Sequence, residues 1–101
     1  MVNSGIIEIS WSYMRIEIND LRFDLDERET NPNRKSDVKE ALLQRFAVSA
    51  RGFDFAFFRM DRKHEWFRAQ FDAKQGVSLE DIRAWLEANG FAGFDVYTVN
   101  W

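Results

Sequence analysis

Apolar and polar residues alternate in the first quarter of the chain, and the phase of the alternation changes twice. The first apolar phase contains Ile7, Ile9, Trp11 and Tyr13, which is typical of a half-buried strand. The second contains Met14, Ile16 and Ile18, and the third contains Leu21, Phe23 and Leu25. A shift of one residue exchanges the two faces of a strand, so a bulge or bend is predicted near Tyr13–Met14.

The second change of phase predicts a tight hairpin turn at Asn19–Asp20. Asn and Asp tolerate the positive φ angles that two-residue turns require. Such a turn pairs residues whose numbers add up to 39, and every pair is then apolar with apolar or opposite in charge. The pairs are Ile18–Leu21, Ile16–Phe23, Met14–Leu25, Arg15–Asp24 and Glu17–Arg22. We therefore expect two antiparallel strands on either side of Asn19–Asp20.

A polar stretch from Asp26 to Lys35, which holds the only proline, Pro32, predicts a loop before a helix. The helix has a four-residue spacing of apolar residues at Val38, Leu42, Phe46 and Ala50, with Ala41 and Ser49 on the same stripe. Ser36 or Asp37 is the expected N-cap, Asp37 and Glu40 have capping-box spacing, and Gly52 is the expected stop.

Two rows of alternating apolar residues predict a second hairpin over 53–73. The rows are Phe53, Phe55 and Phe57, then Phe67, Ala69, Phe71 and Ala73. A three-residue tip, Asp61-Arg62-Lys63, gives pairs adding up to 124, so that Phe57 faces Phe67 and Arg59 faces Glu65. A two-residue turn would set Phe57 against Arg68, so the three-residue connection is preferred.

The last third of the chain predicts a helix and a strand. Ser78 and Asp81 have capping-box spacing, Val77 and Ile82 occupy the positions of a hydrophobic staple, and Gly90 is the expected stop. The helix has an apolar stripe at Leu79, Ile82 and Leu86, with Trp85 as a further candidate for it. Residues 94–99 are predicted to form the final strand.

The expected fold is one α+β domain, 1–101, with an antiparallel sheet of about five strands and two helices on one face, in the order ββαββαβ. From Leu21 onward the order is also βαββαβ, so a ferredoxin-like variant is the alternative. The predicted hairpin conflicts with that alternative, because it gives the first strand an extra partner.

Composition narrows the class of protein. The chain has 46% hydrophobic and 16% aromatic residues and no cysteine, which excludes disulfides and thiol catalysis and favours a cytoplasmic protein. Residues 1–9 have no signal-peptide pattern, and no apolar run is long enough for a membrane span. The net charge is −3, although residues 34–70 carry nine bases and five acids. We expect a basic central hairpin on an acidic body or, as the plainer interpretation, ordinary surface variation.

No motif in the sequence indicates an enzyme. His64 has Asp61 and Glu65 nearby, but it lies at a hairpin tip, where an ordinary surface histidine is the better interpretation than a proton shuttle. The acidic run Asp24, Asp26, Glu27 and Glu29 is interrupted by Arg28 and has no glycine of a calcium loop. The five glycines are scattered and form no phosphate loop. We therefore expect no catalytic site, no metal and no cofactor.

The most informative feature is the second face of the 53–73 hairpin. Phe58, Met60 and Trp66 take the phase that should be polar in a one-sided sheet, with Phe58 expected opposite Trp66. They are surrounded by Arg59, Arg62, Lys63, His64 and Arg68. This is either a binding surface of aromatic anchors with a basic rim, or a face covered by the same chain, for instance by Trp101 or the N-terminal strand.

The expected function is a non-enzymatic protein-interaction domain that binds and inhibits a protein partner, of the phage anti-defence or toxin-immunity type. An acidic surface suits a basic partner, such as a nucleic-acid-handling protein, and a homodimer is left open. The alternative is an RNA- or single-strand-binding domain, in which Phe58 and Trp66 stack on bases. The negative net charge counts against direct nucleic-acid binding.

Overall fold

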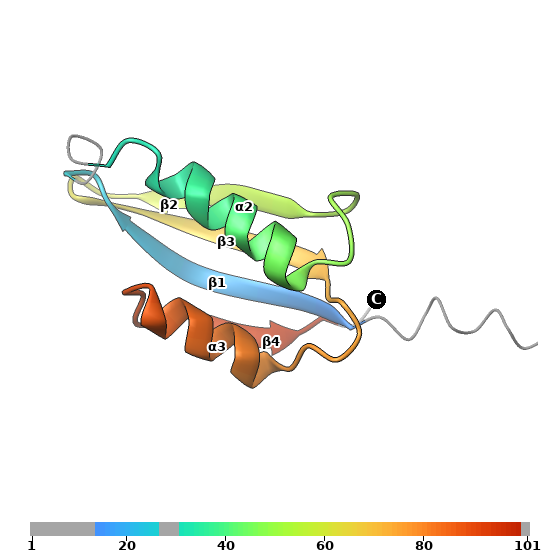
Figure 1. Ribbon diagram of the computed structural model, residues 1–101. Helices are drawn as coiled ribbons and strands as arrows, with labels where there is room; N and C mark the ends of the chain where they lie inside the picture. Colours follow the sequence, from blue (N-terminus) through green and yellow to red (C-terminus); the bar gives the residue numbers. More distant parts are fainter. Residues whose placement is uncertain (1–13, 27–30, 100–101) are drawn as a thin grey trace, which may run out of the picture.

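Four strands and two helices make up the part of the chain that the computed structural model describes, residues 14–26 and 31–99 (Figure 1). In chain order they are β1 (Arg15–Asp24), α2 (Arg34–Phe46), β2 (Asp54–Met60), β3 (His64–Asp72), α3 (Leu79–Ala88) and β4 (Asp95–Thr98). The predicted strand at Ile7–Tyr13, the bend near Tyr13–Met14 and Trp101 fall outside the described residues, in whole or in part.

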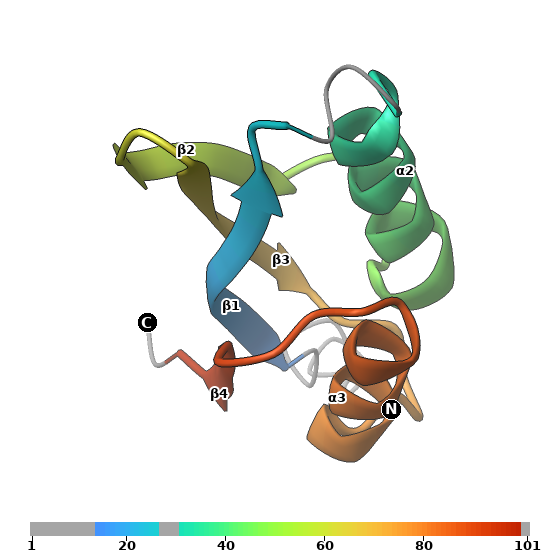
Figure 2. The same ribbon diagram turned by 90° about the vertical axis from the view of Figure 1, so that its left-hand side faces the viewer.

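The four strands form one antiparallel sheet in the order β2-β3-β1-β4. Both helices lie on the same face of this sheet, and no described helix covers the other face, which is called the open face below (Figure 2). The α+β class, the antiparallel sheet and the two helices on one face are therefore confirmed. The described elements follow the order βαββαβ, as in the ferredoxin-like alternative. The predictions of five strands and of the order ββαββαβ are wrong for this part of the chain.

The predicted hairpin at Asn19–Asp20 is wrong, because β1 runs straight through these residues. Along β3 the pairing steps from Ala69 to Phe67, two residues, while along β1 it steps from Ile18 to Leu21, three residues. The extra residue makes a bulge in which Asp20 has φ of 61°. A bulge shifts the apolar phase by one residue, as a two-residue turn does, so the pattern alone fits both.

The bulge keeps four apolar side chains of β1 on the helix side, at most 4% exposed: Ile16, Ile18, Leu21 and Phe23. The predicted pair of Glu17 with Arg22 does not form. Glu17 lies opposite Gln70 of β3 and Tyr97 of β4, and Arg22 lies opposite Trp66. β1 is thus a central strand, where the hairpin prediction had a turn.

The second hairpin is confirmed, and its predicted register holds for the half nearer the base. Phe55 pairs with Ala69 and Phe57 pairs with Phe67. Closer to the tip the register shifts at a second bulge, so that Arg59 lies opposite Trp66 and Met60 opposite Glu65. The predicted pairs of Arg59 with Glu65 and of Phe58 with Trp66 are wrong, because Phe58 is the extra residue of this bulge.

Helix α2 begins and ends earlier than predicted. Its N-cap is Asn33, with no side-chain capping hydrogen bond, and Ser36 and Asp37 lie inside the helix. The helix stops at Phe46 because Ala47 is extended and bridges to Ala73, next to the end of β3. Gly52, the predicted stop, belongs to the turn before β2, where its φ of 78° suits glycine.

Helix α3 confirms the capping prediction. The Ser78 hydroxyl accepts a hydrogen bond from the Asp81 amide at 3.1 Å, and the Asp81 carboxylate accepts one from the Ser78 amide at 2.9 Å. The helix ends at Ala88, just before Gly90, whose φ is 88°. Ile82 and Leu86 are fully buried, while Leu79 and Trp85 pack at the edge of the core.

Replacing Ser78 with alanine should lower the free energy of unfolding by about 0.5–2 kcal/mol, because the amide of Asp81 loses its acceptor. Urea denaturation of the purified chain measures the change. Ser36→Ala is the matched control, since Ser36 is exposed inside α2 and caps nothing. Equal midpoints for Ser78→Ala and the wild type would show that the cap does not contribute.

Candidate functional site

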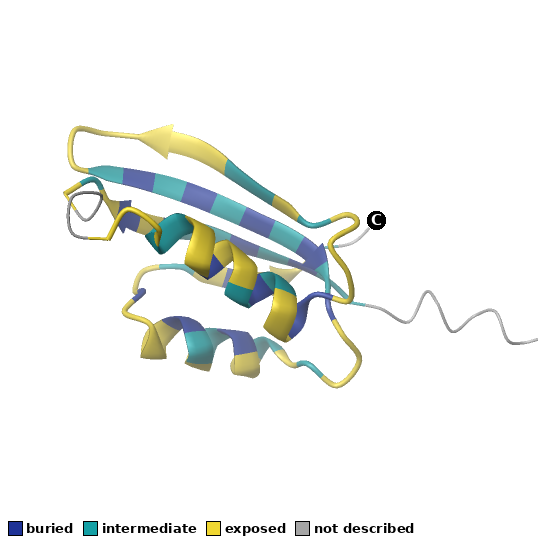
Figure 3. Cartoon of the chain, turned by 45° about the horizontal axis from the view of Figure 1, so that its top comes forward, coloured by how far each residue is buried: buried dark blue, intermediate teal, exposed yellow. Residues whose placement is uncertain are grey.

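The outer half of β2 exposes a cluster of large apolar side chains. Phe57 is 49% exposed, Phe58 39% and Met60 56%. Among the described residues, the only other large hydrophobic side chains with comparable exposure are those of Val48 and Tyr97. Figure 3 shows the contrast: β3 alternates between buried and intermediate residues, while β2 becomes exposed toward the tip of the hairpin.

The exposure follows from the place of β2 in the sheet. β2 is an edge strand that pairs only with β3 among the described strands. The base of the strand still contacts the core through Phe53 and Phe55. Phe57, which the pattern assigns to the core, lies beyond that contact and is half exposed.

The bulge at Phe58 divides the three exposed side chains between the two faces of the sheet. Phe57 and Met60 lie opposite Phe67 and Glu65, which are buried on the helix side. Arg59 lies opposite Trp66, which faces the open side, and the Arg59 guanidinium is 5.7 Å from the ring of Phe58. The expected single row of Phe58, Met60 and Trp66 is therefore split, with Met60 on the other face.

Arg59 holds the open-face part of this cluster together. Its guanidinium lies 4.4 Å from the centre of the Trp66 ring and 3.7 Å from the carboxylate of Asp20. Asp20 is the residue with positive φ in the bulge of β1, so the ion pair joins the two bulges across β3. Trp66 is partly covered, and Arg59 is engaged within the molecule.

His64 lies between two carboxylates at the tip. Its Nε2 is 3.3 Å from Asp24 and its Nδ1 is 3.5 Å from Asp61, and its ring packs 5.6 Å from that of Trp66. Oδ1 of Asp61 also accepts hydrogen bonds from the amides of Lys63 and His64, both at 2.7 Å. These backbone hydrogen bonds hold the pKa of Asp61 below its ordinary value of 3.8. Asp61 thus closes the turn.

The pKa of Asp61 predicts how the tip responds to acid. Because the folded pKa is lowered, the contribution of Asp61 to stability is present above pH 3.8 and lost as the pH falls through the folded pKa. The amide shifts of Lys63 and His64 in NMR spectra should titrate with a midpoint below 3.8. Asp61→Asn keeps an acceptor oxygen and should remove this titration. A midpoint at or above 3.8 in the wild type would contradict the assignment.

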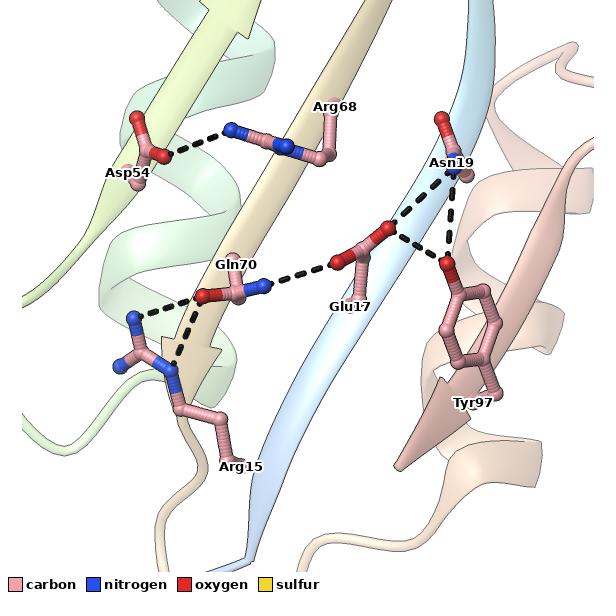
Figure 4. Close-up of polar contacts among 7 residues, drawn as sticks. All are labelled: Arg15, Glu17, Asn19, Asp54, Arg68, Gln70 and Tyr97. Atoms are coloured by element: carbon pink, nitrogen blue, oxygen red, sulfur yellow. Dashed lines mark hydrogen bonds and ion pairs between the residues drawn. The ribbon is translucent and has the colours of Figure 1, made fainter. Parts of the chain in front are cut away.

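The remaining cations of the predicted site differ in their partners. Arg68 points to the open face and donates to the Asp54 carboxylate at 3.2 Å (Figure 4). Arg62 and Lys63 are exposed at the tip and form no ion pair with a carboxylate in the ranges 14–26 and 31–99. The tip therefore presents two cations, without an ion pair to a described carboxylate, beside the exposed apolar side chains.

A polar network occupies the open face nearer β4 (Figure 4). Gln70 accepts a hydrogen bond from Arg15 at 3.1 Å and donates one to Glu17 at 2.8 Å. The Tyr97 hydroxyl donates to the other oxygen of Glu17, and this hydrogen bond raises the pKa of Tyr97 above 10.0. This part of the open face matches the expectation of polar residues on an uncovered sheet.

Glu65 was expected opposite Arg59, but it is buried on the other face of the sheet. It is only 6% exposed, on the helix side, with its carboxylate 3.3 Å from the ammonium group of Lys35. The same ammonium group lies 4.9 Å from the Phe67 ring. The signal was present in the pattern, because Glu65 shares the phase of Phe67, Ala69 and Phe71.

The described residues contain no group of three or more His, Asp or Glu side chains that could hold a metal ion. Of the acidic run in the sequence, Glu27 and Glu29 fall outside those residues. In the same part of the chain no helix is long and apolar enough to cross a membrane.

Comparison of the chain with protein-family models, with curated proteins and with solved structures finds no match.

Proposed function

We propose that the chain is a non-enzymatic binding domain for a protein partner, and that the outer half of β2 makes the contact. The observation that carries the proposal is the cluster of Phe57, Phe58 and Met60 on an edge strand. Aromatic residues and methionine are enriched in the buried centres of protein interfaces. Complete burial of such a side chain contributes roughly 1.5–3 kcal/mol, so three half-exposed ones offer a partner several kcal/mol.

A basic rim beside an apolar centre supports the same proposal. Arg62 and Lys63 supply the rim at the tip, while the chain as a whole carries a charge of −3. Contact at this edge would also be the means of the inhibition that we expect of the complex. We also propose that the protein is cytoplasmic and that residues 1–101 form one domain.

The alternative of nucleic-acid binding has less support, because most arginines of the open face already have acidic partners. Arg15 lies 3.5 Å from Asp72. Arg59 and Arg68 form their ion pairs with Asp20 and Asp54. Phosphate contacts would have to displace these carboxylates, and the acidic groups would repel the backbone of a nucleic acid.

The test is a comparison of three immobilised proteins in a lysate of the source cell. They are the wild type, the edge-strand variant (Phe57→Ser, Phe58→Ser and Met60→Ser together) and Val48→Ser, which alters an exposed apolar residue elsewhere. We expect a protein that the wild type and Val48→Ser retain after nuclease treatment, and that the edge-strand variant binds at least about 30-fold more weakly, the effect of a single hot spot.

Circular dichroism and thermal unfolding should first show that all three proteins are folded. Retention of the partner by the edge-strand variant would contradict the proposed site. Loss of binding after nuclease treatment would favour the nucleic-acid alternative.

A further inference from the structure

We infer that the partner contributes an extended, acidic segment that pairs with β2 as an additional strand of the sheet. This inference rests on the proposed function and specifies its geometry and chemistry. It follows from three observations: the edge position of β2, the distribution of its apolar side chains over both faces, and the two cations that follow it without an ion pair in the described residues.

The first observation concerns the backbone. An edge strand presents a row of amide and carbonyl groups on its outer side, which an extended segment can pair with. β2 contains seven residues, Asp54–Met60, and has neither the proline nor the lysine that often protect an edge, although it has the bulge at Phe58. Its only described neighbour in the sheet is β3.

The second observation concerns the side chains. Phe57 and Met60 are exposed on the helix side, and Phe58 is exposed on the open side. A helix or a flat surface that packs on one face would leave the other face exposed. The side chains of an added strand alternate between the two faces, so one segment in the plane of the sheet can contact all three residues.

The bulge at Phe58 counts against a second copy of the chain as the occupant. Antiparallel pairing of two β2 strands, centred on the exposed apolar residues, would bring the two bulges side by side. A bulge disrupts the ladder locally, so two facing bulges would disrupt the pairing on both strands. A segment of different sequence can follow the bend.

The third observation concerns charge. Arg62 and Lys63 form the turn that joins the end of β2 to β3, and they make no ion pair with a carboxylate in the described ranges. Asp61, which lies between them and the strand, uses its carboxylate to close the turn. Glutamate or aspartate in the added segment would complement the two cations and speed its association.

The test uses a synthetic eight-residue peptide with four valines at its centre and two glutamates at each end, so that valine side chains fall on both faces of the sheet. NMR titration of the isotopically labelled chain should show shifts centred on the amides of β2, and the outward amides of this strand should exchange with solvent at least tenfold more slowly. Alternate amides of an extended peptide point to its two opposite edges, and only one edge pairs with β2. N-methylation of the amides on the pairing edge should therefore weaken binding at least tenfold. N-methylation of the amides on the other edge should leave binding unchanged. A peptide with lysine in place of every glutamate should also bind at least tenfold more weakly than the glutamate peptide.

Each contrary result overturns one part of the inference about the partner segment. Equal binding of the two N-methylated peptides, or no binding at about 1 mM peptide, overturns strand addition. The proposed function survives this result if the edge-strand variant still loses the partner in the lysate, and fails if the variant retains it. Equal affinity for the lysine peptide overturns the acidic chemistry. A dimer in sedimentation experiments that the edge-strand variant abolishes would make a second copy the occupant.

Discussion

Insertion of two glycines between Asn19 and Asp20 should lower the free energy of unfolding by at least about 4 kcal/mol, in the range that marks a severe structural defect. At this point β1 pairs with β3 on one side and with β4 on the other, through residues such as Ile18 with Ala69 and with Val96. The ladder with β4 ends at Asn19, but two extra residues would break the ladder with β3 or displace Leu21 and the residues after it along β3.

The same insertion at a true hairpin turn gives the matched control. Two glycines between Arg62 and Lys63 lengthen the exposed tip of the second hairpin and move Asp61 away from the amides of Lys63 and His64. The cost should stay near about 1–2 kcal/mol, because loop-closure entropy grows slowly with length and only these exposed hydrogen bonds are lost. Urea denaturation followed by circular dichroism measures both proteins. Comparable small losses would show that Asn19–Asp20 is a turn after all.

Replacement of Phe71 with alanine should destabilise the chain by about 3–5 kcal/mol, the usual cost of removing a phenylalanine ring from a packed core. Phe71 is 0% exposed in β3, lies opposite Ile16 and stacks on the ring of Phe53 at 5.4 Å between centroids. The ring lies in the core formed by the sheet and the helices, so the cavity cannot collapse without moving the central strands.

Phe58→Ala is the matched control for this substitution, because the same ring is removed from a site that is 39% exposed. We expect a loss below about 1 kcal/mol, although partner binding should fall. Denaturation midpoints at constant m-value give the comparison. A loss for Phe58→Ala as large as that for Phe71→Ala would mean that Phe58 is core and cannot be the contact.

The sequence predicted elements well where a local signal has one interpretation. The capping box at Ser78 and Asp81 and the pair of aromatic rows at Phe55–Phe57 and Phe67–Phe71 are such signals. The phase change at Asn19–Asp20 has two interpretations, a turn or a bulge. The choice depends on β3 and β4, which lie far away in the sequence.

The tip of the second hairpin shows a related limit. Near the base the pairs add up to 124, the value of the three-residue connection, and near the tip they add up to 125, the value of the rejected two-residue turn. Each register is right for one half of the hairpin, and the bulge at Phe58 joins them. A search for one register cannot find this, because the extra residue has no characteristic side chain.

The candidate site was predicted in part. The sequence grouped Phe58, Arg59 and Trp66, which the structure brings together on the open face. It placed Met60 on the wrong face, because the bulge was not foreseen, and it assigned Phe57 to the core. The exposure of Phe57 depends on the strand order, which puts β2 at the edge, and no local pattern encodes that order.

The central position of β1 also sets the order of events when the chain is synthesised. β1 precedes both strands that flank it, and one of them, β4, is the last described element. Ile16 and Ile18 therefore leave the ribosome long before their partners in β3 and β4 exist. Pairings between residues so far apart in the sequence slow folding. The β-forming residues of β1 therefore stay exposed in the nascent chain until β4 has emerged. We expect chaperones to bind mainly at β1 during that interval.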